Sequence, residues 1–339
     1  MADPFEKLKD APRLLMEARL KPLQGQRFQP TGFADLGPAR YQSATNVSML
    51  LVESAQSVAN WLEAMIWDPP QLGRLSSPNA NLANEVKDIP FVKVTRKDKT
   101  VLTNSLIEAH RLNSPYIMRD DAFKKRLTEE LRSNLDGPLD VQVFSKVVFR
   151  YDPNAVLHGV MLEEIAGRLR LPRLISGFIE ASDVKDAAYG GVMNNIINPK
   201  GIEGHGGSSN ILYHRSDFTG NLVAFFNLDL AQLRGYGLGA SAETFLTALA
   251  LFKIRRFLKS GLRLRTACDL DVDGELKVTR PDGFAVPDEK ALAGILKEAL
   301  AACKKESLFA DPPVTTVVYE EKKKSGKDKT AETDAAEEE

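Results

Sequence analysis

The sequence has little cysteine, with only Cys268 and Cys303 among 339 residues. Two cysteines cannot form a disulfide framework, so a reducing, cytoplasmic location is expected. No apolar run reaches the roughly 18 residues that a membrane-spanning helix needs, so no membrane partner is expected. The first twenty residues mix acids and bases without a continuous apolar segment. We therefore expect no secretory signal peptide there.

The sequence also lacks the residue spacings that mark common catalytic sites. Its histidines show no H-x-x-x-H spacing, and no C-x-x-C or G-x-S-x-G occurs. The run "GHGGSS" lacks the Lys-Ser/Thr end of a phosphate-binding P-loop. We therefore expect no metal, no cofactor and no catalytic residues. His205 or His214 could still serve as a general base for RNA cleavage, although a histidine in a glycine-rich loop is more often merely exposed.

Two short motifs match known binding loops only in part. "GYGLGA" at 235–240 fits a dinucleotide fingerprint through Gly235 and Gly237, but "AQLR" separates it from the preceding strand pattern. A strand-to-helix loop is the simpler interpretation. "DLDVDG" at 269–274 opens like a calcium loop, but its twelfth position is Arg280 instead of a glutamate. A hairpin with a turn at Asp273-Gly274 is the simpler prediction there.

Charge is distributed unevenly along the chain. The formal charge of −1 becomes +2 without residues 320–339, because this polar tail carries −3. The tail contains no large apolar residue, so we predict that it is disordered. Residues 250–266 contain six bases and no acid. A basic face of this kind attracts polyanions, although it is also typical of a solvated helix.

Hydrophobic periodicity predicts an α+β fold. Strand patterns cover 13–21, 221–230 and 262–270, and helical patterns cover 54–67 and 240–259. Ser54 is the expected N-cap of the first helix. The second helix places Lys253, Arg255, Arg256 and Lys259 on an arc opposite its apolar stripe, and the strand after it points Arg263 and Arg265 outward. Thr266 and Cys268 point inward in this pattern, so Cys268 is a core thiol.

Eight stretches together resemble one known family. They are "LKPLQGQRFQPTGFADLG", "MLLVESAQSVANWLEAMIWD", "LTNSLIEAHRLNSPYI", "FRYDPNAVLHGV", "RLPRLISGFIEA", "GGVMNN", "FNLDLAQLRGYGLG" and "KIRRFLKSGLRLRTACDL". They are spread over about residues 13–271, which is most of the chain, and they resemble the backbone subunit of the type I-G (formerly I-U) CRISPR effector, a member of the RAMP superfamily.

The resemblance implies a fold and a domain organisation. The expected fold is α+β, a modified RRM or ferredoxin-like palm with helical insertions and a protruding thumb hairpin. Residues 1–319 would form this single palm, with an insertion at about 68–140 and a thumb at about 182–218. The glycine-rich segment 190–210 would project from that thumb.

The resemblance also implies a function. Such subunits are not nucleases; they oligomerise along a guide RNA and present it for pairing with target DNA in antiviral defence. The expected partners are the guide RNA, target DNA through the guide, other copies of the chain and other effector subunits. Two alternatives stay open: a RAMP endoribonuclease that processes repeat RNA, and a dinucleotide-binding enzyme.

The resemblance places the RNA site on the loop after the first strand and on the start of the first helix. Lys21 and Arg27 would neutralise phosphates, and Gln24, Gln56 and Asn60 would bond phosphate or 2′-hydroxyl oxygens. In the thumb, Phe218 would wedge against a base and Arg215 would hold a phosphate. Arg234, Arg255 and Arg256 complete the predicted RNA-binding set.

Overall fold

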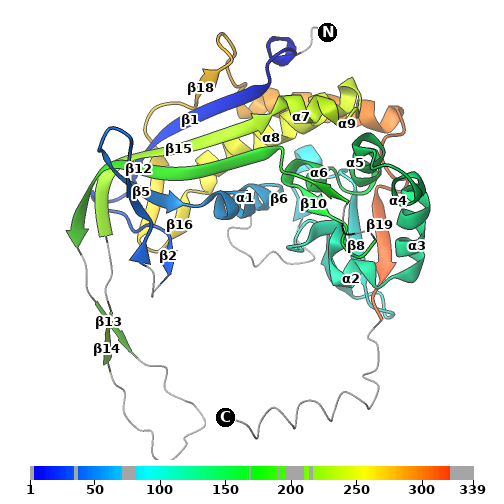
Figure 1. The fold of residues 1–339 in the computed structure, drawn as a ribbon, viewed down its shortest axis with the longest axis horizontal. Coiled ribbons are helices and arrows are strands. Elements are labelled where there is room, and N and C mark those ends of the chain that lie inside the picture. Colours follow the sequence, from blue (N-terminus) through cyan, green and yellow to red (C-terminus); the bar gives the residue numbers. More distant parts are fainter. Residues whose placement is uncertain are drawn as a thin grey trace, which may run out of the picture.

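The computed structural model describes residues 4–33, 37–70, 81–165, 167, 169–188, 191–194, 210–213 and 217–320. The chain is a mixed α+β structure, as the sequence predicts, and is built on a curled antiparallel sheet (Figure 1). In order across the sheet, the strands are β16 (Arg263–Arg265), β17 (Cys268–Val272), β1 (Arg13–Pro22), β15 (Asp217–Asp229), β12 (Ile175–Ala188), β5 (Ser48–Glu53) and β4 (Arg40–Gln42). A further strand, β18 (Lys277–Arg280), pairs with β1.

One face of the sheet packs against helices. β15 alternates as predicted, with Ala224, Phe226 and Leu228 buried beneath α1 (Ala55–Ala64) and α8 (Ala240–Ser260). The Phe226 ring meets Phe257 of α8 edge-on, with ring centroids 6.2 Å apart. A second layer forms where α9 (Glu289–Lys305) packs along α8. We call the side of the sheet that packs against α1 and α8 the helix face.

Glycine at position 177 sets the close approach of α1 to the sheet. A Cβ built at Gly177 would lie 2.9 Å from the Phe225 carbonyl oxygen and 3.0 Å from a Val58 methyl group of α1. Any side chain here would push helix and sheet apart. Ser54 caps α1 as predicted, accepting a hydrogen bond from the Ser57 N–H at 3.2 Å.

A smaller mixed sheet, accompanied by several helices, follows α1 in the chain, and the C-terminal strand completes it. β8 (Phe91–Thr95) pairs with β9 (Val101–Asn104) on one side and runs parallel to β19 (Val314–Val318) on the other. Its helices are α2 (Pro115–Met118), α3 (Asp121–Glu130), α4 (Arg132–Asp136), α5 (Val141–Tyr151) and α6 (Pro153–His158). Helices α3, α5 and α6, like α7 (Leu230–Gly235) and α9, begin after an aspartate whose carboxylate caps the helix.

The remaining elements are short. They are η1 (Glu6–Leu8), β2 (Gly32–Phe33), β3 (Gly37–Pro38), β6 (Trp67–Asp68), β7 (Asn81–Leu82), η2 (Asn84–Val86), η3 (Arg111–Asn113), β10 (Val160–Met161), β11 (Arg170–Leu171), β13 (Gly191–Asn194) and β14 (Asn210–Tyr213). None of the helices in the described ranges is long and apolar enough to cross a bilayer.

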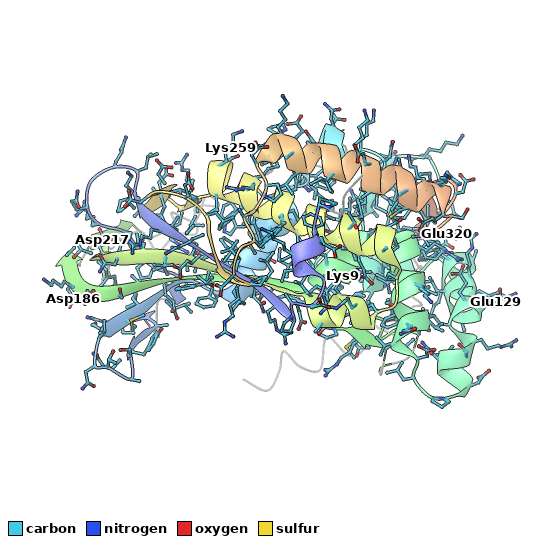
Figure 2. All side chains as sticks on the ribbon, turned by 90° about the horizontal axis from the view of Figure 1, so that it is seen from above. Lys9, Glu129, Asp186, Asp217, Lys259 and Glu320 are labelled. Atoms are coloured by element: carbon cyan, nitrogen blue, oxygen red, sulfur yellow. The ribbon has the colours of Figure 1, made fainter. Side chains whose placement is uncertain are left out.

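The predicted thumb lies partly outside the described residues. β12 and β15 continue as a bulged two-stranded ribbon as far as Ala188 and Asp217. Seen from above, Asp186 and Asp217 lie together at the far end of this ribbon (Figure 2). β13 pairs with β14, but Arg215, His205 and His214 fall outside the described ranges, as does most of the predicted tail. The thumb therefore stays a prediction.

Two predictions for the segment after α8 are wrong in detail. The strand predicted at 262–270 is two antiparallel strands, β16 and β17, joined by an exposed turn at Thr266. The predicted hairpin at Asp273-Gly274 does not form, because β17 and β18 both pair with β1 instead of with each other. Cys268 is buried as predicted, and burial raises the pKa of its thiol to about 11.

The glycine motif "GYGLGA" also has a different setting from the predicted strand-to-helix loop. It joins α7 to α8, and Gly237 and Gly239 adopt positive φ values of 58° and 92°. A dinucleotide site requires a parallel strand running directly into the glycine turn. The motif follows a helix here, and the strand before that helix belongs to an antiparallel sheet, which contradicts the dinucleotide alternative.

Candidate nucleic-acid interface

The loop after β1 is held at both ends and exposed in the middle. Phe28 is buried and exchanges two backbone hydrogen bonds of 2.9 Å with Phe218 of β15. The Gln29 N–H bonds to Ala267 in the β16–β17 turn at 2.8 Å. Between these anchors and β1, residues 23–27 are exposed, with Gly25 at φ +71°. The buried Phe28 thus fixes the position of the exposed polar residues that precede it.

This exposed stretch borders a groove of about 720 Å³, which we call the loop groove. Gln24, Gln26 and Arg27 line one side, and Arg263 of β16 contributes to the lining. The Arg27 Nε lies 3.5 Å from Asp217 Oδ2, and the Lys21 Nζ lies 3.1 Å from Asp273 Oδ1. Both cations are more than half exposed. The Lys21–Asp273 pair is exposed on both sides and contributes little, so Lys21 can exchange its carboxylate for a phosphate. Arg27 instead pairs with a buried carboxylate and keeps its own guanidinium exposed at the groove.

A second groove of about 710 Å³ runs beside α1, and we call it the helix groove. Gln56 and Asn60 of α1 lie on its wall, and Gln56 Nε2 donates to Asn60 Oδ1 at 3.4 Å. Arg173 comes from the loop between β11 and β12 and donates to Gln56 Oε1. β16 contributes Arg263 to the loop groove and Leu264 to the helix groove, so the two grooves lie on the two sides of this edge strand.

Two arginines give the helix groove a positive end. Arg111 Nε donates to Glu63 Oε1 at 2.7 Å, so this arginine has a carboxylate partner. Partial burial lowers the pKa of Arg173, and the neighbouring Arg111 guanidinium lowers it further. Of the acids in the groove lining, Glu63 pairs with Arg111, and Glu108 accepts from Thr103 and Ser114. The lining thus holds two guanidinium groups, and Arg173 is the one without a carboxylate partner of its own among the described residues.

Arg111 and Arg173 are absent from the predicted site. They lie far apart in sequence, at η3 and before β12, and no local pattern relates either of them to α1. The fold alone brings them together. The predicted Lys21, Gln24, Arg27, Gln56 and Asn60 lie at the two grooves or, for Lys21, at the base of the loop.

Phe218 and Arg256 do not fit their predicted role. Phe218 is 1 % exposed, and the Arg40 guanidinium covers its ring at 5.2 Å, so it cannot wedge against a base. Arg256 is 8 % exposed and donates to the Trp67 carbonyl at 3.0 Å. The predicted exposed arc of α8 is therefore wrong at this position, because the helix is covered on more than one side.

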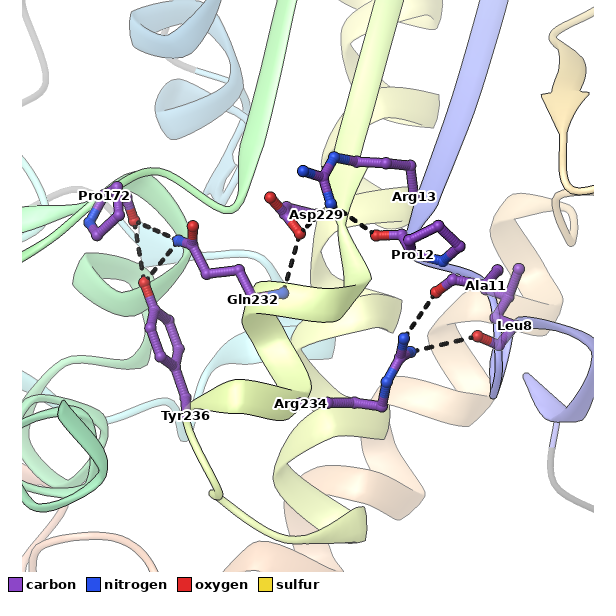
Figure 3. Close-up of polar contacts among 9 residues, drawn as sticks. All are labelled: Leu8, Ala11, Pro12, Arg13, Pro172, Asp229, Gln232, Arg234 and Tyr236. Carbon is purple, nitrogen blue, oxygen red and sulfur yellow. Dashed lines mark hydrogen bonds and ion pairs between the residues drawn. The ribbon is translucent and has the colours of Figure 1, made fainter.

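Arg234 and Arg255 are also engaged in structural hydrogen bonds. Arg234 donates to the Ala11 carbonyl at 2.9 Å and to the Leu8 carbonyl at 3.5 Å, which fastens the N-terminal segment to α7 (Figure 3). Arg255 donates to the carbonyls of Val286 and Pro287 at 2.6 and 3.1 Å. Both guanidinium groups hold chain segments in place.

The sequence also predicts that Lys253 lies on the exposed arc of α8, but this side chain is fully buried behind the helix groove. Its Nζ donates to Asn154 Oδ1 and lies 2.8 Å from His158 Nε2. Burial lowers the pKa of Lys253 to about 7 and raises the pKa of nearby Asp152 to about 6. Since these side chains are buried, the cluster supports the groove wall and does not meet a ligand.

Within the described ranges, no group of three or more histidine, cysteine, aspartate or glutamate side chains could hold a metal ion. The two grooves thus offer guanidinium, ammonium and amide groups. Groups of these kinds can donate hydrogen bonds to phosphates without selecting bases.

Comparison with known proteins identifies the family. A protein-family model described as "CRISPR-associated protein GSU0053 (Cas_GSU0053)" matches residues 14–186, just over half of the chain. No curated protein matches the sequence.

Among solved structures, a chain of "CRISPR RNA-guided surveillance complex, pre-nicking" is 12 % identical, with 87 % of this chain and 89 % of that chain covered and a TM-score of 0.36. The crystal structure of Thermofilum pendens Csc2 is 12 % identical, with 91 % and 83 % covered and a TM-score of 0.31. TM-scores this low do not establish a shared fold. The family match confirms the resemblance seen in the sequence: the chain belongs to the CRISPR-associated GSU0053 family.

Proposed function

We propose that this chain is a non-catalytic, RNA-binding backbone subunit of a type I CRISPR effector complex. Several copies line up along one guide RNA and present it for pairing with target DNA. In this proposal the sheet and its helices are a modified RRM-like palm, residues 68–140 are an insertion, and residues 182–218 are the thumb. Other effector subunits bind the same assembly.

The observation that carries this proposal is the pair of grooves on the two sides of β16. Their polar walls combine cations, Arg27, Arg111 and Arg173, with the amides of Gln24 and Gln56. Such groups bond phosphates and 2′-hydroxyls and leave the base edges free. A guide carrier needs this arrangement, because base pairing and not the protein reads the target.

The endoribonuclease alternative rests on His205 and His214, which lie outside the described residues. Among the described residues, no histidine lines either groove. The proposal therefore assigns guide processing and DNA cleavage to other proteins.

The expected result of removing two groove cations is weaker guide binding with a smaller salt dependence. The double variant Arg27→Ala/Arg173→Ala loses two phosphate contacts, so the slope of log K against log salt should flatten by about 1.4, or roughly 0.7 per contact. Affinity should fall at least about tenfold, because hydrogen bonds to charged groups are the stronger ones. Fluorescence anisotropy with a labelled guide RNA at several salt concentrations measures both quantities.

Arg132→Ala is the matched control, because Arg132 is 80 % exposed and lies on α4, outside the linings of both grooves. It should leave affinity and slope unchanged. Unchanged binding by the double variant would refute the assignment of the guide to these grooves.

A further inference from the structure

The sheet has a second face that carries aromatic side chains. Along β15 and β12, the residues that alternate with the buried core point away from α1 and α8. On this side Phe225 stacks on Phe178, with ring centroids 5.1 Å apart and planes 26° apart. Phe178 is 36 % exposed. We call this side the open face.

Strand register places further side chains around the stacked pair. Phe225 lies opposite Phe178 on β12 and opposite Glu17 on β1. Two residues before Phe225 on β15, Val223 lies between Arg19 of β1 and Glu180 of β12. Glu180 in turn pairs with Leu51 of β5. The open face thus carries a strip in which Phe178, Phe225 and Val223 alternate with the charged side chains of Glu17, Arg19 and Glu180. A mainly polar composition is expected on a face that only meets water, so the stacked rings within this strip need an explanation.

A third aromatic ring extends the strip to the edge of the sheet. Tyr41 of β4 is 43 % exposed, and its hydroxyl donates to Glu180 Oε1 at 2.7 Å. This bond, with burial, raises the pKa of Tyr41 to about 12.

Exposed cations border the other end of the strip. Arg19 of β1 and Lys277 and Arg280 of β18 are all exposed. Lys277 lies opposite Glu17 and Arg280 opposite Leu15, so both cations lie on β18, with β1 between them and the aromatic rings of β15 and β12.

We infer that the open face binds single-stranded nucleic acid through its bases, as a site separate from the two grooves. Aromatic rings in a row supply stacking surfaces, and bordering cations neutralise phosphates, which is the combination that single-strand binders use. α1, which lines the helix groove, packs on the opposite side of the sheet. A guide in the helix groove therefore leaves the open face accessible to a second strand, and none of the three aromatic rings lines the loop groove. This inference goes beyond the proposed function and does not depend on it.

The test is titration of the protein, free and loaded with guide RNA, with a fluorescent oligodeoxythymidine that cannot pair with the guide. Phe178→Ala should weaken binding of this strand by about 5- to 150-fold, the range found when a base-stacking ring is removed. The salt slope should stay unchanged, since no phosphate contact is lost. Lys277→Ala should instead flatten the slope by about 0.7. Phe178→Trp should keep or strengthen binding.

Tyr116→Ala is the matched control, because Tyr116 also stacks at 5.1 Å, on Tyr319, and is 39 % exposed on α2. It should have no effect. Three results would overturn the inference: no binding of the oligodeoxythymidine to guide-loaded protein, equal losses in Tyr116→Ala and Phe178→Ala, or a Phe178→Ala variant that changes sedimentation but not strand affinity. The last would mark the open face as a contact between copies of the chain. Guide binding, measured separately with Arg27→Ala/Arg173→Ala, distinguishes failure of the groove proposal from failure of this one.

Discussion

Replacing Arg265 by alanine is expected to lower the free energy of unfolding by about 3–5 kcal/mol, because it leaves a buried carboxylate without its counterion. Arg265 bonds the Glu53 carboxylate, which is 2 % exposed at the end of β5. The same guanidinium donates to the Gln29 carbonyl at 2.8 Å and to the Val52 carbonyl at 3.3 Å. One side chain thus joins the loop after β1, β5 and the β16–β17 hairpin.

Urea unfolding measures this loss, and Arg263→Ala is its matched control. Arg263 lies in the same short strand but is exposed, so its removal should change stability by no more than about 0.5 kcal/mol. A double variant, Glu53→Met/Arg265→Met, should regain most of the lost stability, since it removes both buried charges. Equal stability of Arg265→Ala and Arg263→Ala would show that the ion pair does not hold the loop in place.

Lys253→Met is expected to remove a large pH dependence of stability. Burial lowers the pKa of Lys253 from 10.5 to about 7 in the folded chain. Between these values the unfolded chain binds a proton that the folded chain does not, so wild-type stability rises with pH across this window. From pH 7 to pH 9 the rise contributed by Lys253 is about 2 kcal/mol. The methionine variant should lack it.

Asp152 does not obscure this measurement. Burial raises its pKa from 3.8 to about 6, so its linkage acts below the lysine window and in the opposite direction. Lys259→Met is the control, because Lys259 is 69 % exposed at the end of the same helix. Identical stability profiles of wild type and Lys253→Met between pH 7 and 9 would contradict the assignment of Lys253 as a buried lysine with a lowered pKa.

The elements with strong periodicity are the ones that the sequence predicts well. The alternation of 221–230 marks the buried side of β15, and Ser54 with its apolar stripe marks α1. The pattern at 262–270 fails because alternation continues through the turn that separates β16 from β17. Local pattern carries no signal for that reversal, which depends on pairing with β1.

The prediction of an exposed basic arc on α8 is wrong for a different reason. Two lysines and two arginines opposite an apolar stripe predict a solvated surface, yet Lys253 and Arg256 are buried. Their partners, Asn154 and the Trp67 carbonyl, come from distant segments that the helix pattern does not contain. Likewise, the site residues on the loop and on α1 follow from the family resemblance, whereas Arg111 and Arg173 are brought to the helix groove by tertiary packing alone.

The most direct test of the central claim is to purify the chain from cells that express its repeat array and to analyse any RNA that copurifies. Our account predicts that nucleic acid dominates the absorbance of the purified sample. It also predicts that the sample contains intact guide RNA, protected from added nuclease along its length. Arg27→Ala/Arg173→Ala should copurify with much less RNA. A wild-type protein that emerges folded, free of RNA and unable to bind added guide would contradict the claim that this chain is a guide-RNA backbone.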